Sequence, residues 1–231
     1  MALKFLLRMS LVTEDGQQTP DLNVDLVRLS PRGEPLSPFL VMLFYSKGIF
    51  SWLHKKGRRM WWSPEPRSVL LLSELKVSRS LRKKLRSGRF RITADTHFEE
   101  VMRLCKLTRE ESWITEEHIE VFSRMHALGH AHSIEVWEGD QLVGGLYGVC
   151  IGELFCGCSM FHTVPDASKI ALVKLVELLA SWRIPLLDCQ VHNPHLQRMG
   201  ARVIPRDTFH RLAGHLVRQK RRVGSWSKYF T

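Results

Sequence analysis

The sequence predicts an α+β fold in which the larger part of the chain builds a mixed sheet. Three apolar or alternating runs separated by glycine-containing turns predict an antiparallel meander, over residues 133–137, 141–149 and 153–159. A strongly apolar helix from Pro165-Asp166 to Trp182 then leads to a short strand over residues 185–190, which is the pattern of a helical crossover between parallel strands. A sheet that combines the meander with the crossover strand is mixed.

Helices are expected before the meander. A short helix over Ser78–Arg86 places Leu81 and Leu85 four residues apart on its buried side. Further helices are predicted to start near Asp95-Thr96 and at Thr115, where acidic residues follow the start and favour a helix N-terminus.

The first part of the chain gives weaker signals. No sustained period is found in residues 1–40, which we interpret as weakly structured. Residues 45–67 are crowded with aromatic residues, glycine and proline, which favours a compact aromatic-lined loop region over regular elements. We therefore expect a small N-terminal domain over residues 1–66 and a larger domain over residues 67–231.

The charge balance favours a polyanionic partner. Lys and Arg outnumber Asp and Glu by 34 to 23 in 231 residues, a net charge of +11, which raises the odds of binding RNA, although a merely basic protein is the alternative. Five cations in eight residues suit contact with a phosphate backbone, whereas a solvated face is the usual outcome for a charge run. These cations are Arg79, Arg82, Lys83, Lys84 and Arg86.

Cysteine usage and the N-terminus point to the cytoplasm. The five cysteines are odd in number and lie mostly in apolar runs, which favours buried thiols in a reducing compartment over disulfides. Arg8 cuts the N-terminal apolar run, and no later run approaches the roughly 18 apolar residues of a membrane span. We expect neither a membrane nor DNA as a partner.

The predicted last strand of the sheet ends in Asp188-Cys189-Gln190. The period of two places Asp188 and Gln190 on one face and Cys189 on the other. An amide and a carboxylate at a strand end can orient an ester carbonyl and an attacking amine. A polar strand end that caps a neighbouring loop is the alternative, and these residue types alone favour it.

Other chemistries fit the motifs less well. Glycines at 144, 145 and 148 interrupt a strand and do not precede a helix, so they do not form a nucleotide fingerprint. Asp166 stands where a coenzyme A pyrophosphate would bind, which disfavours that cofactor. Cys156 and Cys158 with His162 have poor spacing for zinc, and a Cys158 nucleophile is a minor alternative to a pocket-wall residue.

Several segments together resemble the leucyl/phenylalanyl-tRNA–protein transferases of bacteria. They follow the family's order over about residues 45–206, which is more specific than any single motif. The segments include Tyr45–Trp52, Trp61–Arg67, Arg79–Arg82, Ser112–Thr115, His130–Trp137, Leu142–Gly148, Ser159–His162, Ala167–Lys169, Asp188–Gln190, Leu196–Ala201 and Pro205-Arg206.

The resemblance implies an acetyltransferase-like (GNAT-like) C-terminal domain and a small, divergent N-terminal domain. It implies transfer of Leu or Phe, with Met as a minor donor, from aminoacyl-tRNA to the N-terminal Arg or Lys of an acceptor protein, which targets that protein for degradation. Because an aminoacyl ester is already activated, the reaction needs a positioned amine and oxyanion stabilisation, and no cofactor or metal.

The resemblance also implies roles for individual residues. The catalytic pair falls on Asp188 and Gln190, and the tRNA-contacting cations fall on the Arg79–Arg86 cluster. The residues implied to bind the aminoacyl group and the terminal adenosine are Tyr45, Trp52, Trp113, Leu146, Gly157, Cys158, Met160 and Leu175.

The chain departs from the family pattern at several places. Cys158 stands where a glutamate is usual, Ser51 where a proline is usual, and residues 1–40 lack the usual N-terminal segment. A carboxylate at position 158 could attract a basic acceptor terminus, so its loss leaves the acceptor open. The alternatives are a non-catalytic tRNA-binding paralogue and a transferase with altered acceptor specificity, such as acidic or oxidised N-termini.

Overall fold

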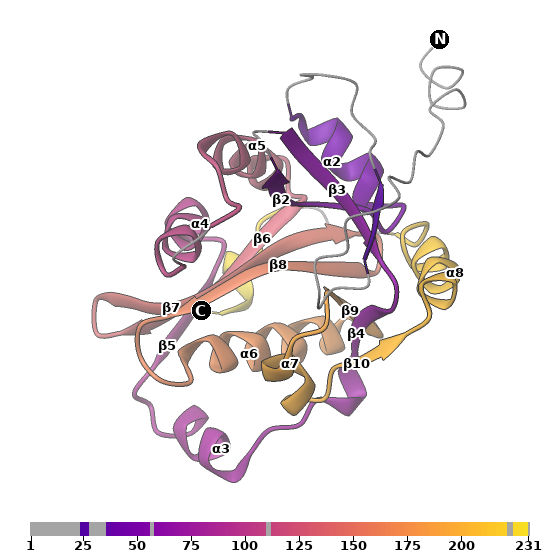
Figure 1. Ribbon diagram of the computed structural model, residues 1–231. Coiled ribbons are helices and arrows are strands. Elements are labelled where there is room, and N and C mark those ends of the chain that lie inside the picture. The colour runs from indigo at the N-terminus through magenta and orange to yellow at the C-terminus, as the bar shows by residue number, and fades with distance from the viewer. Residues whose placement is uncertain (1–23, 28–35, 56–57, 110–111, 221–223, 231) are drawn as a thin grey trace.

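The larger of two sheets forms the centre of the molecule. The computed structural model describes residues 24–27, 36–55, 58–109, 112–220 and 224–230 (Figure 1). The larger sheet has the order β10-β4-β9-β8-β7-β6-β5, and every neighbouring pair is antiparallel except the parallel pair β8–β9. The strands are β4 (Arg67–Leu71), β5 (Arg91–Ala94), β6 (Ala131–Glu138), β7 (Gln141–Ile151), β8 (Leu154–His162), β9 (Leu186–Gln190) and β10 (Arg202–Ile204). The predicted α+β class, the mixed sheet, the meander and the crossover are confirmed.

Helices cover both faces of this sheet (Figure 1). On one face lie α4 (Phe98–Leu107) and α5 (Glu116–Ala127), and on the other lies the crossover helix α6 (Ala167–Ser181). The remaining helices are α3 (Arg79–Leu85), α7 (Pro194–Arg198) and α8 (Arg206–Leu216), with 3-10 turns at Leu72–Glu74 and Ser227–Tyr229. The side chain of Thr115 caps α5 by accepting from the His118 backbone N–H, and Ser78 caps α3 in the same way, as the predicted starts require.

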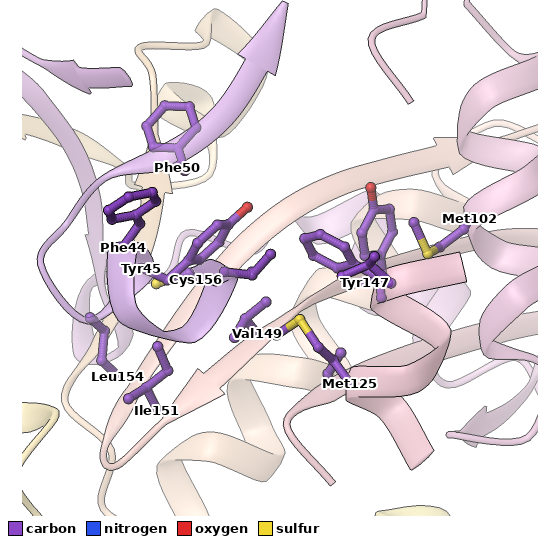
Figure 2. Close-up of a cluster of buried hydrophobic side chains, with 14 of the residues drawn as sticks. Phe44, Tyr45, Phe50, Met102, Met125, Tyr147, Val149, Ile151, Leu154 and Cys156 are labelled. Atoms are coloured by element: carbon purple, nitrogen blue, oxygen red, sulfur yellow. The ribbon is translucent and has the colours of Figure 1, made fainter. Parts of the chain in front are cut away.

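Each face of the sheet buries its own hydrophobic cluster. The cluster under α4 and α5 joins residues of β7 and β8 to Phe44, Phe50 and Trp61 (Figure 2). The cluster under α6 is built from the opposite side of the same strands. Gly144 permits this packing, because a Cβ at that position would come within 2.5 Å of the Cβ of Ala167 on α6. Helix packing thus explains Gly144, whereas a Cβ at Gly148 would collide with the Cys156 carbonyl oxygen on β8.

The N-terminal region is more regular than the sequence indicates. A second sheet has the order β1-β3-β2, from β1 (Val24–Val27), β2 (Phe50–Lys55) and β3 (Arg58–Pro64), and α2 (Pro38–Tyr45) lies between β1 and β2 in the chain. The expected loop region over residues 45–67 and the irregular lead-in are therefore wrong for these elements. Proline and glycine concealed the period of the hairpin, although Ser37 before Pro38 carries the signal for a capped helix.

The small sheet and the large sheet follow each other in the chain. The small sheet ends at Pro64 and the large sheet begins at Arg67, yet one hydrophobic cluster contains Trp61 together with Phe122 and Tyr147. The division into domains 1–66 and 67–231 stays a prediction. No helix in the described part of the chain is long and apolar enough to cross a membrane.

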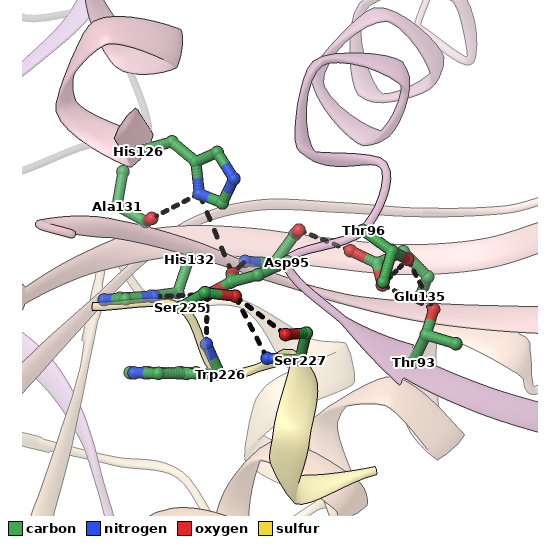
Figure 3. Close-up of polar contacts among 11 residues, drawn as sticks. Thr93, Asp95, Thr96, His126, Ala131, His132, Glu135, Ser225, Trp226 and Ser227 are labelled. Carbon is green, nitrogen blue, oxygen red and sulfur yellow. Dashed lines mark hydrogen bonds and ion pairs between the residues drawn. The ribbon is translucent and has the colours of Figure 1, made fainter. Parts of the chain in front are cut away.

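A buried aspartate anchors the C-terminal segment to the edge of the large sheet (Figure 3). The fully buried carboxylate of Asp95 accepts from the backbone N–H of Ser133 at 2.9 Å and of Trp226 at 2.7 Å, and lies 2.8 Å from Nδ1 of His132. The His132 and Trp226 rings stack with centroids 3.7 Å apart. These contacts fix Trp226 in the cluster under α6.

Candidate active site

Strands β8 and β9 pair over a short stretch and then separate. Their pairing runs from Leu154 opposite Leu186 to Cys156 opposite Asp188, whereas β8 continues to His162 while paired with β7. We call the point where this pairing stops the strand fork. Asp188 is therefore the last residue of β9 that pairs with β8, and Gln190 ends β9 just beyond this pairing.

Both strands of the fork carry a bulge. In β8 the register with β7 shifts so that Tyr147 opposes Ser159 and Gly148 opposes Gly157, which leaves Cys158 as the extra residue. In β9 the register with β4 shifts in the same way and leaves Cys189 extra. Bulges re-aim side chains and occur often beside active sites. The bulge in β9 therefore interrupts the simple alternation expected of Asp188, Cys189 and Gln190.

Asp188 is fully buried in an ion pair with Arg67 of β4. The Asp188 carboxylate accepts from Nε of Arg67 at 2.8 Å and from Nη2 at 2.6 Å, and both side chains are at most 1% exposed. The Arg67 guanidinium also lies between the rings of Phe50 and Phe209 and donates to the Gly48 carbonyl. A carboxylate held by two guanidinium N–H groups is fixed in position, so it is suited to hold neighbouring groups in place.

The ion pair holds the backbone of Gln190. The Gln190 N–H donates to Oδ1 of Asp188 at 2.9 Å, and Gln190 adopts a left-handed conformation with φ 63°. Its side chain is 8% exposed, and its Nε2 is buried without a hydrogen-bond partner in the described part of the chain. An amide donor held unpaired at a strand end can stabilise a developing oxyanion.

The Cys158 thiol lies half-buried beside Tyr45, with Sγ 3.6 Å from the tyrosine oxygen. Burial is the main cause that raises the pKa of Cys158 to about 12, and the nearby Asp188 raises it further. Burial also raises the pKa of Tyr45 well above its usual value. Both groups stay protonated at neutral pH, which argues against a Cys158 thiolate nucleophile.

The remaining cysteines are buried thiols. All five cysteines are free thiols, and burial raises the pKa of Cys105 to about 12 and that of Cys156 well above its usual value. Among the described residues, no three His, Cys, Asp or Glu side chains are placed to hold a metal ion.

The predicted aminoacyl-binding residues lie in two groups. Leu146 and Met160 face each other across β7 and β8, and Leu175 of α6 lies in the same cluster. Tyr45, Trp52, Trp113 and Cys158 belong to the cluster under α4 and α5 instead. At Gly157 a Cβ would lie 3.6 Å from the Asp188 carbonyl, which places this glycine at the fork. The structure brings together each group, and their action as one pocket stays a prediction.

A buried hydrogen-bonded chain links the two tryptophan segments of the second group. Oγ of Ser51 lies 3.0 Å from Nε2 of His118, and Oγ1 of Thr115 lies 2.9 Å from Nδ1 of the same ring. The His118 ring meets Trp113 edge-on at 5.5 Å, and Ser51 precedes Trp52 in β2. Sequence reasoning missed His118 because a lone histidine on a helix carries no motif.

Arg67 was also missed as a site residue. It occurs in one of the segments that carry the family resemblance. The available signal was a positively charged residue at the start of a short strand whose following residues, from Val69 on, are apolar. Only the fold shows that this cation is buried against Asp188, because 121 positions separate the two residues.

One face of the basic helix α3, with the two residues that follow it, lines an open hollow on the surface. Leu81 anchors the helix in the core, and Ser87 joins the cationic residues around a hollow of about 560 Å³; these are Arg79, Arg82, Lys83 and Arg86. Lys84 does not line the hollow and instead pairs with Asp166 at 2.5 Å. A concave group of four cations suits a phosphate backbone.

Comparison with known proteins identifies the family. Residues 69–214 match the family model described as leucyl/phenylalanyl-tRNA protein transferase. The chain is 42% identical over 198 residues to the transferase of that name from Legionella pneumophila (strain Lens), covering 84% of this chain and 89% of the relative. It is 45% identical over 213 residues to the one from Nitrosospira multiformis (strain ATCC 25196 / NCIMB 11849 / C 71), covering 90% and 92%.

Solved structures resemble parts of the chain at low sequence identity. L-PGS from Bacillus licheniformis aligns with 57% of this chain and 49% of its own, at 12% identity and a TM-score of 0.38. A GCN5-related N-acetyltransferase-like protein from Streptococcus suis 89/1591 aligns with 72% and 63%, at 12% identity and a TM-score of 0.36. By its sequence matches, the chain belongs to the leucyl/phenylalanyl-tRNA–protein transferase family of aminoacyltransferases.

Proposed function

We propose that this chain transfers Leu or Phe, with Met as a minor donor, from aminoacyl-tRNA to the N-terminal Arg or Lys of cytoplasmic proteins and so marks them for degradation. The observation that supports this best is the strand fork, where the Asp188–Arg67 pair holds the backbone of Gln190 while the Gln190 amide nitrogen has no hydrogen-bond partner among the residues that the structure describes. Family membership supplies the reaction class, aminoacyl transfer from tRNA to protein.

The proposed step is attack by the neutral α-amine of the acceptor on the ester carbonyl of the donor. The new C–N bond forms as the C–O bond to the terminal ribose breaks, and the amine proton passes to the leaving ribose oxygen. The Gln190 amide donates to the carbonyl oxygen as negative charge develops there. Asp188 and Arg67 keep that amide in place, so Gln190 acts as the catalytic residue and the buried pair as positioning residues.

The two sides of the substrate meet different parts of the chain. The cationic hollow of α3 takes phosphates of the tRNA, and the apolar groups around Trp52 and Met160 take the aminoacyl side chain. An apolar pocket discriminates one methylene by about 1–3 kcal/mol, which accounts for tolerance among Leu, Phe and Met.

One observation favours a second candidate, a transferase with a changed acceptor. The Cys158 thiol carries no charge at neutral pH, and the charge of Asp188 is already compensated by Arg67. Neither group offers a free carboxylate to a basic acceptor terminus. This candidate keeps the donor and the chemistry but accepts neutral, acidic or oxidised N-terminal residues.

Peptides that differ only in their first residue test both candidates. Labelled Leu or Phe on tRNA is incubated with each peptide, and transfer is measured for the wild-type chain, Gln190→Ala and Cys158→Glu. Transfer to Arg and Lys peptides that falls at least about 100-fold in Gln190→Ala supports the first candidate, in line with the loss of one oxyanion donor. Preference for another first residue, moved towards Arg by Cys158→Glu, supports the second. Transfer to no peptide overturns both.

A further inference from the structure

Three polar side chains lie on elements that come together beyond the strand fork. His162 ends β8, Lys169 lies in the first turn of α6, and His195 lies in α7, which follows β9. Oγ of Ser168, the residue before Lys169, lies 3.2 Å from Nδ1 of His162, which joins the end of β8 to the start of α6, and the charge of Lys169 acts on His195. We call these three residues the fork corner. Its members come from three elements that converge where β9 has ended and β8 continues.

The fork corner is connected to the basic helix α3. Asp166 accepts from Nζ of Lys169 at 2.7 Å and from Nζ of Lys84 at 2.5 Å, so one carboxylate joins α6 to α3. The side chains of Lys169 and Lys84 are about one-third exposed, at 35% and 36%. One carboxylate shared by two ammonium groups leaves a net positive charge at this junction. Positive charge thus extends from the α3 hollow towards the fork.

His195 adds a neutral polar group to this positive surface. Its side chain is half-buried, and its Nε2 atom is buried without a hydrogen-bond partner in the described ranges. Burial lowers the pKa of His195 first, and the charges of Lys169 and Arg198 lower it further. The imidazole is therefore uncharged at neutral pH, and can stack on a base or hydrogen-bond to a base edge or a ribose hydroxyl.

We propose that the fork corner binds the single-stranded 3′ end of the donor RNA on its path from the α3 hollow to the strand fork. Lys169 contacts a phosphate of that strand, and His195 contacts a base or a ribose hydroxyl. The proposal rests on the proposed function, because it requires that α3 hold the helical part of the same RNA. In this arrangement α3 binds the base-paired stem and the fork corner binds the single-stranded nucleotides that follow the stem.

Two hairpin RNAs separate the corner from the basic helix. One ends in a single-stranded ACCA at its 3′ end, and the other has the same stem and a blunt end. Binding is measured by fluorescence anisotropy at several salt concentrations for the wild type and for single variants. Lys169→Ala and His195→Ala test the corner, with His195→Gln as a conservative variant that retains a polar group. Arg82→Ala tests the hollow.

Lys174→Ala is the matched control. Lys174 lies on the same helix and pairs with a carboxylate three residues away, Glu177 at 2.8 Å, as Lys169 pairs with Asp166. The expected result is a loss of about fivefold in affinity for the ACCA hairpin in Lys169→Ala and in His195→Ala, with the blunt hairpin unchanged. Lys169→Ala also reduces the salt slope by about 0.7 for one single-stranded phosphate. Lys174→Ala leaves both hairpins unchanged, and thermal melting confirms that each variant is folded.

Failure of the corner and failure of the proposed function give different results. If Arg82→Ala weakens both hairpins but the corner variants match the wild type, the corner proposal is overturned and RNA binding by α3 stands. Equal losses for the blunt and the ACCA hairpins in Lys169→Ala also overturn the corner proposal. If the wild-type chain binds neither hairpin, the RNA-dependent function itself is contradicted.

Discussion

Two aspartates with fully buried carboxylates lie near the ends of strands in the large sheet. Asp188 lies two residues before the end of β9, next to the cluster under α4 and α5, and Asp95 directly follows β5 beside the cluster under α6. Asp188 accepts from the guanidinium of Arg67 and from the N–H of the nearby Gln190, whereas Asp95 accepts from the backbone N–H groups of Ser133 and Trp226 and lies beside His132. Burial alone does not separate them.

The two carboxylates differ in the groups that they hold in place. Beside Asp188 lies Gln190, at the point where two strands separate, and its amide nitrogen is without a partner in the described ranges of the chain. Asp95 instead holds the segment around Trp226 against the sheet. We infer that a buried carboxylate serves chemistry when it positions an unpaired group, and serves the fold when its donors are backbone groups of distant segments.

Breaking the Asp188 pair should have the largest effect. Arg67→Met leaves a buried carboxylate without its cation, which should lower the free energy of unfolding by about 3–5 kcal/mol. The double variant Arg67→Met/Asp188→Leu should lose less, because it leaves no buried charge unpaired. Urea denaturation monitored by fluorescence measures both. If the double variant is as unstable as the single one, the stabilisation comes from packing of Arg67 between Phe50 and Phe209.

Removing the other carboxylate should affect the fold but not the chemistry. Asp95→Ala deprives the backbone N–H groups of Ser133 and Trp226 of their acceptor, at a cost of about 2–3 kcal/mol. The value of kcat per folded molecule should stay near that of the wild type. Urea denaturation measures the stability, and kcat is measured at a low temperature at which the variant is fully folded. A large fall in kcat under those conditions would show that Asp95 also serves the chemistry.

The contrast between these aspartates also marks what could be read from the sequence. The meander, the crossover and the α5 start were predictable because their periods, turns and caps are local, as at Thr115. Asp188 was singled out by its place on the last strand and by family resemblance. Arg67 and Asp95 were not singled out, because no local pattern encodes their pairing. Arg67 binds Asp188, which is 121 positions away, and Asp95 binds Trp226, which is 131 positions away.

The buried contact between the Ser51 hydroxyl and the His118 ring should have an intermediate effect on stability. Ser51→Ala removes the hydroxyl from Nε2 of His118, which should cost about 1–2 kcal/mol, less than either aspartate variant. Because the pair adjoins Trp52 and Trp113, the variant should also change KM for the donor more than kcat. His118→Leu alone and combined with Ser51→Ala gives a double-mutant cycle, and a coupling energy of zero would show that the contact contributes nothing.

The last prediction concerns reactivity and leaves the stability unchanged: it uses the Cys158 thiol, which lies near Asp188 and whose pKa is raised by burial and by that charge. With a pKa of about 12, the native thiol is about one part in ten thousand ionised at pH 8, against about one in four for an ordinary thiol. Because a more basic thiolate is intrinsically more nucleophilic, the net slowing of alkylation should be about 50-fold relative to the unfolded chain. Iodoacetamide labelling followed by mass spectrometry measures this rate.

The pH dependence of the same labelling reaction sharpens the test. Since a raised pKa means that the Cys158 thiol loses its proton only at high pH, the labelling rate of the native chain should rise about tenfold per pH unit from pH 7 to 9. A plateau near pH 8 would instead show an ionised thiol beside the buried ion pair, and would reopen a nucleophilic role for Cys158.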